Sequence, residues 1–138
     1  MPLMNYTTKI DSAKTAHEIT WALQKMGASE VLQRFEQGRP IALAFAITTD
    51  IGVRQYALPV RWEPVLAVLK RQRVARSFHT QEQAERVAWR ILKDWVFAQI
   101  AVIESGITSL DEVMFPYMLG KGGTVYEQFK SRQLELNP

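Results

Sequence analysis

The sequence predicts one α+β domain over residues 1–138, in which an antiparallel β-meander of about three to four strands packs on a long helix. One helical pattern runs without an internal glycine or proline through residues 80–106, in the C-terminal half of the chain. Ahead of it, three strand-like runs at 31–36, 41–48 and 53–60 follow one another with turn residues between them. Shorter helices are expected on both sides of these elements.

The N-terminal part of the chain is predicted to contribute a short strand at residues 6–10 and then a helix over 12–26. Asp11 is well placed to accept hydrogen bonds from the first turn of that helix. Gly27 tolerates the left-handed backbone that commonly ends helices. The apolar residues between these two signals recur three or four positions apart, as they do on a helix that buries one face.

The three strands are predicted from alternation, which is clearest in the run 41–48. Its two faces carry Ile41, Leu43, Phe45 and Ile47 on one side and Ala42, Ala44, Ala46 and Thr48 on the other. We expect the bulky face to pack against the long helix. The alanine face has two interpretations: it meets solvent, or it allows a backbone, helix or flat ligand to approach closely. Val31 and Phe35 are expected to share one face of the first strand.

The long helix begins with a predicted Thr-x-x-Gln capping box, formed by Thr80 and Gln83, and Gly106 lies just past its end. Two apolar stripes run along it, one through Ala84, Ala88, Ile91, Trp95, Ala98 and Val102 and one through Trp89, Leu92, Val96, Ile100 and Ile103. We expect Trp95 to lie at the centre of the core. Phe97 falls where the polar face should continue, so this half of the helix is either central or covered by a second subunit, which makes a homodimer the expected assembly.

The remaining segments are shorter. A helix is expected to start at about Pro64, and Ser109 with Glu112 forms a capping box for a short helix that ends near Pro116. Residues 120–123 are predicted to form a flexible glycine loop, and residues 124–133 a last helix.

The composition excludes several function classes. The chain has no cysteine and two histidines, so a thiolate site is absent and a zinc site would need carboxylate ligands. No Gly-x-Ser-x-Gly elbow occurs, and the glycines around Lys121 lack the rest of a P-loop. We therefore expect no enzyme, metal or cofactor. No run of residues is apolar enough to span a membrane or to form a signal-peptide core, so a cytoplasmic location is expected.

Basic residues give the strongest functional signal. Arginines 71, 73 and 76 lie close together in the segment before the long helix, and Arg86, Arg90 and Lys93 project from one side of that helix. If the segment folds back, these six side chains would converge and could hold phosphates. Nearby aromatic residues could stack on bases: Trp62, Phe78 and Trp89. The alternative is a connector whose charges only meet water.

Three stretches carry a resemblance to known sequences: NYTTKI at residues 5–10, EQAERVAWRILKDWV at 82–96 and FPY at 115–117. They resemble a group of small proteins encoded by bacteriophages, prophages and metagenomic phage contigs, and the resemblance covers most of the chain. It implies an accessory role in a phage-infected bacterial cell and no catalytic residues, since no activity is established for that group.

Three functional hypotheses follow. The first is a binding protein that sequesters a phosphorylated ligand, in particular a nucleotide signal of host immunity. The second is a single-stranded DNA-binding accessory of phage replication or recombination. The third is an inhibitor that binds a host protein through an exposed apolar patch around Phe97. A pocket closed by the basic segment would favour the first hypothesis, and an open basic surface would favour the second.

Overall fold

The computed structural model describes residues 1–132 and confirms the α+β class. Helix α1 (Ser12–Met26) leads into an antiparallel sheet of β1 (Glu30–Glu36), β2 (Arg39–Thr49) and β3 (Gly52–Leu58), in the order β1-β2-β3. Helix α2 (Glu63–Arg71) and the 3-10 turn η1 (Arg76–Phe78) precede the long helix α3 (Gln81–Glu104). The described chain ends with α4 (Leu110–Met114), η2 (Phe115–Tyr117), β4 (Leu119–Gly120), β5 (Gly123–Thr124) and α5 (Val125–Ser131).

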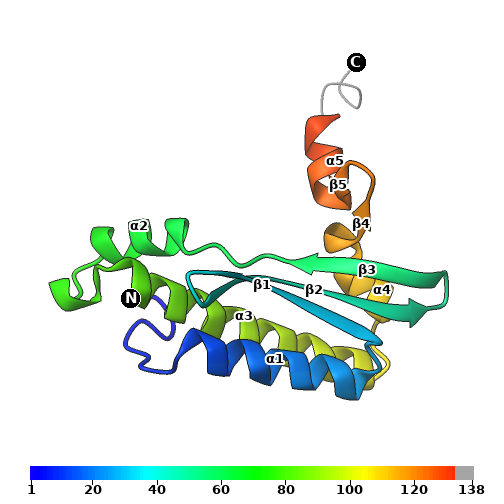
Figure 1. Cartoon of the computed structure of the whole chain (residues 1–138), viewed down its shortest axis with the longest axis horizontal. Helices are drawn as coiled ribbons and strands as arrows, with labels where there is room; N and C mark the ends of the chain where they lie inside the picture. The colour runs from blue at the N-terminus through cyan, green and yellow to red at the C-terminus, as the bar shows by residue number, and fades with distance from the viewer. Residues whose placement is uncertain (133–138) are drawn as a thin grey trace.

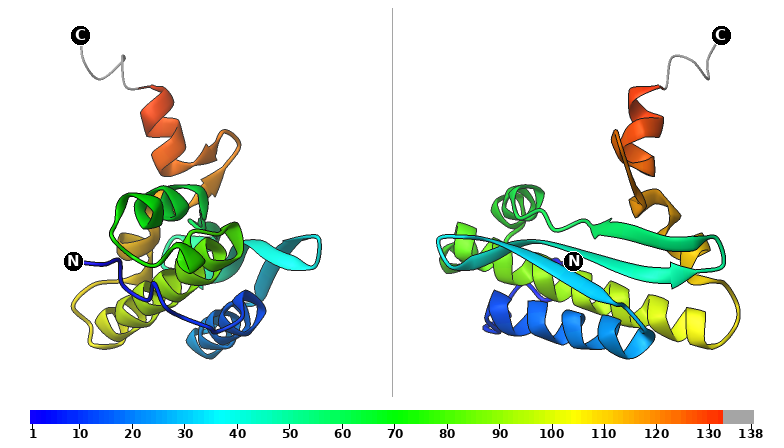
Figure 2. Two further views of the ribbon diagram at one scale, coloured as in Figure 1. Left: turned by 90° about the vertical axis from the view of Figure 1, so that its left-hand side faces the viewer. Right: turned by 45° about the vertical axis from the view of Figure 1, so that its right-hand side comes forward.

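Two layers make up the body of the molecule. Helices α1 and α3 lie side by side and cover one face of the three-stranded sheet (Figure 1). The segment formed by β4, β5 and α5, here called the C-terminal arm, leaves the body beside β3, where Met118 pairs with Tyr56. All views show α5 projecting away from both layers (Figure 2). The sheet and the two helices therefore form the scaffold, and the arm is attached to it at one place.

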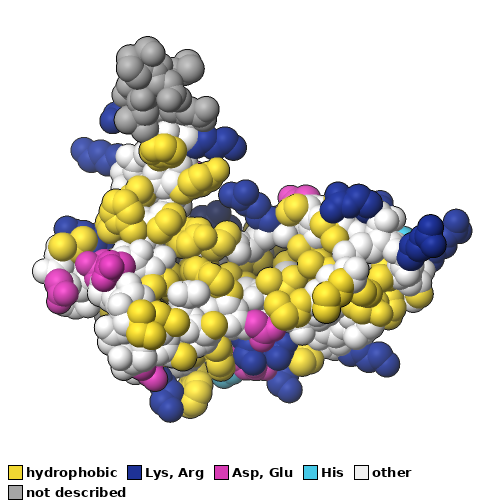
Figure 3. All heavy atoms as spheres, turned by 180° about the vertical axis from the view of Figure 1, so that it is seen from behind, with side chains coloured by type: hydrophobic (Ala, Val, Ile, Leu, Met, Phe, Trp, Pro, Cys, Tyr) yellow, Lys and Arg dark blue, Asp and Glu magenta, His cyan; other side chains and the backbone are white. Residues whose placement is uncertain are grey.

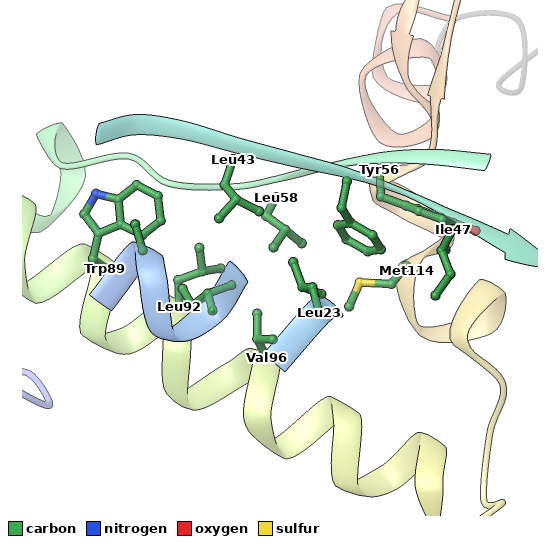
Figure 4. Close-up of a cluster of buried hydrophobic side chains, with 12 residues drawn as sticks. Leu23, Leu43, Ile47, Tyr56, Leu58, Trp89, Leu92, Val96 and Met114 are labelled. Atoms are coloured by element: carbon green, nitrogen blue, oxygen red, sulfur yellow. The ribbon is translucent and has the colours of Figure 1, made fainter. Parts of the chain in front are cut away.

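The core lies between the sheet and the two helices (Figure 4). The strand register places Phe45 between Val31 and Tyr56, and Leu43 between Gln33 and Leu58. The buried cluster that these strands share with the helices comprises Ala16, Ile19, Leu23, Leu43, Phe45, Ile47, Tyr56, Leu58, Trp89, Leu92, Val96 and Met114. Bulky residues of β2 thus face the helices, as the alternation predicts.

Trp89, and not Trp95, is the central tryptophan of α3. Its side chain is 1% exposed, and its indole N–H donates a hydrogen bond to the carbonyl oxygen of Pro40 at 3.1 Å. The prediction for Trp95 is wrong, because the stripe through Trp89, Leu92 and Val96 is the one that faces the sheet. Trp95 is half-buried instead and packs edge-on against Tyr117, with 5.7 Å between the ring centroids.

Helix ends follow the predicted signals closely. The Asp11 carboxylate accepts a hydrogen bond from the Ala13 N–H, and Gly27 takes φ +113° at the other end of α1. Capping boxes begin α4, through Ser109 and Glu112, and α5, through Thr124 and Glu127. Backbone N–H groups of the cap residues hold the pKa of both glutamates below the ordinary value.

Residues 1–10, here called the N-terminal strap, form turns and extended coil rather than the strand predicted at 6–10. The cause lies in α3: the Gln83 amide donates to the carbonyl oxygens of Tyr6 at 2.7 Å and Thr8 at 3.0 Å. A side chain therefore occupies the acceptors that a neighbouring strand would use. For the same reason, the predicted capping box of α3 is half formed, since Thr80 accepts from the Gln83 N–H but the Gln83 side chain binds the strap.

We predict that Gln83→Ala lowers the free energy of unfolding by about 1–3 kcal/mol, because two partly buried carbonyl groups lose their donor. Urea denaturation measures this loss, and amide hydrogen exchange in the strap should accelerate in the same variant. Gln81→Ala is the matched control, since Gln81 lies two positions earlier on α3 and its side chain is exposed. Equal losses in the two variants would show that the strap is not held by Gln83.

Two smaller predictions also differ from the structure, and a third is confirmed as far as the described residues reach. The β1–β2 register shifts between Arg34 and Phe35, and this bulge leaves Phe35 exposed while Val31 packs against the core. The predicted glycine loop at residues 120–123 forms the β4–β5 hairpin. The last helix is confirmed as α5, but Gln133, its predicted final residue, lies outside the described residues.

Candidate functional site

Residues 70–79, which comprise the end of α2 and the segment that follows it up to α3, carry several exposed basic side chains and are here called the basic connector. Gln72 fixes it to the N-terminal strap, because its side chain accepts from the Leu3 N–H at 2.9 Å and donates to the Met1 carbonyl. Arg71, Arg73 and Arg76 are all exposed, and within residues 1–132 none of them forms an ion pair with an acidic side chain. Their charges are thus available to a ligand.

The other three predicted phosphate ligands are already engaged on α3. Arg86 donates through Nε and Nη2 to Oε1 of Gln83, at 3.1 and 2.7 Å. Arg90 lies 3.3 Å from the Glu18 carboxylate of α1, and the Lys93 ammonium lies 3.9 Å from the same group. Arg90 and Lys93 therefore join α3 to α1. The expected convergence of six cations does not occur, because the acid of α1 holds two of them elsewhere.

Two of the three predicted stacking residues already pack within the chain. Trp89 is buried in the core, so it is unavailable. Phe78 is half-buried and packs edge-on against Tyr6 of the strap, with 5.5 Å between the ring centroids. Trp62 is half-buried and lines a small cavity of about 10 Å³ next to Trp89. The basic connector consequently offers charge, and only the exposed parts of Phe78 and Trp62 could stack on a base.

A second polar feature is a cavity beside Lys9 of the strap. This mixed-charge cavity has a volume of about 380 Å³ and is lined by Lys9, Asp11, Arg39, Glu82, Glu85 and Arg86. Glu85 is only 5% exposed, and its Oε2 lies 3.4 Å from Nε of Arg39. Neither Nε of Arg39 nor Oε1 of Glu85 has a hydrogen-bond partner among the described residues. A buried donor and a buried acceptor in this cavity thus lack hydrogen bonds. This lowers the stability of the folded chain, and a ligand that supplies the missing hydrogen bonds would recover the loss.

Sequence reasoning missed Glu85 and Arg39 as site residues, although a signal for Glu85 exists. Glu85 lies four positions before Trp89 and seven before Leu92, which places a carboxylate on the buried stripe of α3. Such a position favours a paired or ligand-binding acid. Arg39 has no comparable signal, because it stands at the start of β2 directly after a turn.

An apolar groove is the largest of the cavities described, with a volume of about 670 Å³. It is lined by Pro59, Arg61, Val65, Ala88, Ile91, Leu92, Trp95, Pro116, Tyr117 and Tyr126. A further shallow cavity of about 390 Å³ lies between α1 and α3, beside Trp21 and Phe97. These two residues are 54% and 38% exposed, so an exposed apolar patch around Phe97 does exist.

Neither a metal-binding cluster nor a membrane-spanning helix occurs in the described part of the chain. No group of three or more histidine, aspartate or glutamate side chains in residues 1–132 could hold a metal ion. No helix of this part is long and apolar enough to cross a membrane. No protein-family model, curated protein or solved structure matches the chain.

Proposed function

We propose that this chain is a non-enzymatic phage accessory protein that binds a phosphorylated ligand through its basic connector in the cytoplasm of the bacterial host. The supporting observation is that Arg71, Arg73 and Arg76 are exposed and close in sequence. None of them has an acidic partner among residues 1–132. Guanidinium groups hold phosphate oxygens by two parallel hydrogen bonds, which makes unpaired arginines well suited to phosphate.

The ligand that this geometry favours is a single-stranded nucleic acid. None of the cavities described above is lined by Arg71, Arg73 or Arg76. Basic side chains gather at the end of the molecule far from the C-terminal arm (Figure 3). An open basic surface suits a polymer that presents one phosphate after another. The corresponding biological role is a DNA-binding accessory of phage replication or recombination.

A nucleotide signal of host immunity is the second candidate ligand, and it is favoured by the mixed-charge cavity. Lys9 lines that cavity and could hold a phosphate, as could Arg86 through the guanidinium nitrogen that Gln83 does not occupy. The unpaired Oε1 of Glu85 could accept a hydrogen bond from the exocyclic amino group of a base, and Nε of Arg39 could donate to a neighbouring acceptor. A ligand of this class would give the protein an anti-defence role by sequestration.

Salt dependence separates the two ligands. We predict that binding of a fluorescent single-stranded oligonucleotide weakens steeply between about 50 and about 200 mM salt, with a log–log slope of roughly 2, because three phosphate contacts each contribute roughly 0.7. A cyclic mononucleotide or dinucleotide in the cavity should respond weakly, since it carries few charges. Filter retention of both ligand types at the two salt concentrations gives the answer. Retention of neither would remove both ligands and leave the host-protein inhibitor, which binds through the patch around Phe97, as the leading hypothesis.

A further inference from the structure

The C-terminal arm and the apolar groove beside it lack a partner that would complete them. Helix α5 has seven residues and no buried side chain, and its two exposed aromatic residues, Tyr126 and Phe129, are 52% and 55% exposed. They are three positions apart and so lie on one face of the helix. A helix of this length is not stable in water on its own, and a hairpin of two-residue strands adds little. The arm therefore needs a surface to pack on.

The apolar groove is such a surface, and it lies at the base of the arm. Helix α3 contributes Ile91, Leu92 and Trp95, α2 contributes Val65, and Tyr117 and Tyr126, the second of them on the arm of the same chain, complete the lining. Hydrophobic side chains fill the hollow between the arm and the body (Figure 3).

We propose that two copies of this chain exchange their C-terminal arms, so that Tyr126 lines the apolar groove of the partner in place of its own and Phe129, exposed in the single chain, packs in the same groove. A second copy is the favoured occupant because one chain supplies both halves of the contact, a projecting aromatic helix and an apolar groove. Reciprocal exchange about a two-fold axis then closes the assembly at a dimer. Gly120 and Gly123 flank the hairpin turn at the base of the arm, and Gly123 has φ +103°. These glycines permit the arm to adjust its direction.

The patch between α1 and α3 is a poorer two-fold contact. The Lys25 ammonium lies 4.4 Å from the centre of the Trp21 ring, and the Lys93 ammonium lies 4.5 Å from the centre of the Phe97 ring. Packing a second subunit on this patch would remove two ammonium groups from water, and burial of charge is costly. The groove has a single cation on its lining, Arg61, whose side chain is exposed.

Light scattering across a dilution series tests the exchange. The wild-type chain should have twice its mass of 15.8 kDa at high micromolar concentration. Phe129→Glu on the arm and Val65→Glu in the groove should each weaken the dimer at least about tenfold, since each places a charge against apolar side chains. Phe97→Glu is the control and should leave the dimer intact. A monomeric wild type, or a dimer broken by Phe97→Glu and spared by Phe129→Glu, would overturn the proposal.

Complementation and crosslinking make the test specific. A mixture of Phe129→Glu and Val65→Glu chains can form a dimer with one intact arm in one intact groove, so mixing should restore part of the dimer population. Circular dichroism of each variant establishes that it is folded before mixing.

Because the chain has no cysteine, single-cysteine chains provide a second measurement. Under mild oxidation, Phe129→Cys and Val65→Cys chains should form the mixed disulfide in preference to either homodisulfide. Absence of that preference, together with absence of rescue, would show that the arms are not exchanged.

Discussion

Trp89→Ala should lower the free energy of unfolding by about 3–5 kcal/mol, as truncation of a buried aromatic residue does in well-packed cores. The substitution leaves a cavity between α3 and the sheet, and it removes the donor that satisfies the carbonyl of Pro40. An unpaired buried carbonyl adds about 1–3 kcal/mol to the cost. Loss on this scale approaches the whole stability of a small domain, so the variant should be partly unfolded in buffer.

Trp95→Ala is the matched control, because it truncates the same side chain on the same helix six positions later. Trp95 is half-buried at the edge of the apolar groove, so we expect a loss less than half that of Trp89→Ala. Urea denaturation at equal protein concentration compares the two variants, with tryptophan fluorescence and circular dichroism as independent probes. If Trp95→Ala proves equally or more destabilising, the orientation of α3 described above is incorrect.

Replacing Arg73 by alanine should weaken binding of a single-stranded oligonucleotide roughly tenfold, because a hydrogen bond to a charged group contributes about 1.5–3 kcal/mol. The triple substitution of Arg71, Arg73 and Arg76 should abolish most of the salt dependence together with the affinity. Arg73→Lys should restore only part of the loss, since lysine keeps the charge and lacks the planar fork. Fluorescence anisotropy with one labelled oligonucleotide measures all these variants.

Arg34→Ala provides the charge-matched control for these substitutions. Arg34 is exposed on β1, outside the basic connector, and its removal changes the net charge by the same amount. We expect it to leave affinity nearly unchanged. Equal weakening by Arg34→Ala and Arg73→Ala would mean that the oligonucleotide responds only to overall charge, and the connector would then be a solvated link between two helices.

The elements that local signals define were predictable from the sequence. Asp11 and Gly27 bound α1 because capping depends on neighbours within one turn, and β2 follows from strict alternation. The strap was not predictable in this way, since the donor for Tyr6 and Thr8 is Gln83, more than seventy positions along the chain. The choice between the two stripes of α3 was equally non-local. Both are apolar, and only the position of the sheet decides that Trp89 is buried.

The candidate site was predictable only in part, for the same physical reason. The exposed arginines of the connector follow from a hydrophilic run between two helices, and no distant residue alters their state. Arg90 and Lys93 look identical to them in sequence, yet both form ion pairs with Glu18 of α1. The partner of Arg39 is likewise remote, because Glu85 follows it by 46 positions. Charge density can be read from a sequence, whereas ion pairing depends on the tertiary contact between elements.

The N-terminal strap has a consequence for the order in which parts of the protein fold during synthesis. Ribosomes release a chain from its N-terminus, so residues 1–10 emerge before the sheet and α3. Their partners are Gln72, Gln83 and Asp94, which leave the ribosome only after the whole sheet has been synthesised. The strap therefore cannot form its native hydrogen bonds while α1 and the meander fold. It can dock only after the first half of α3 has reached its native position. The strap is therefore synthesised before the sheet but reaches its native position after it.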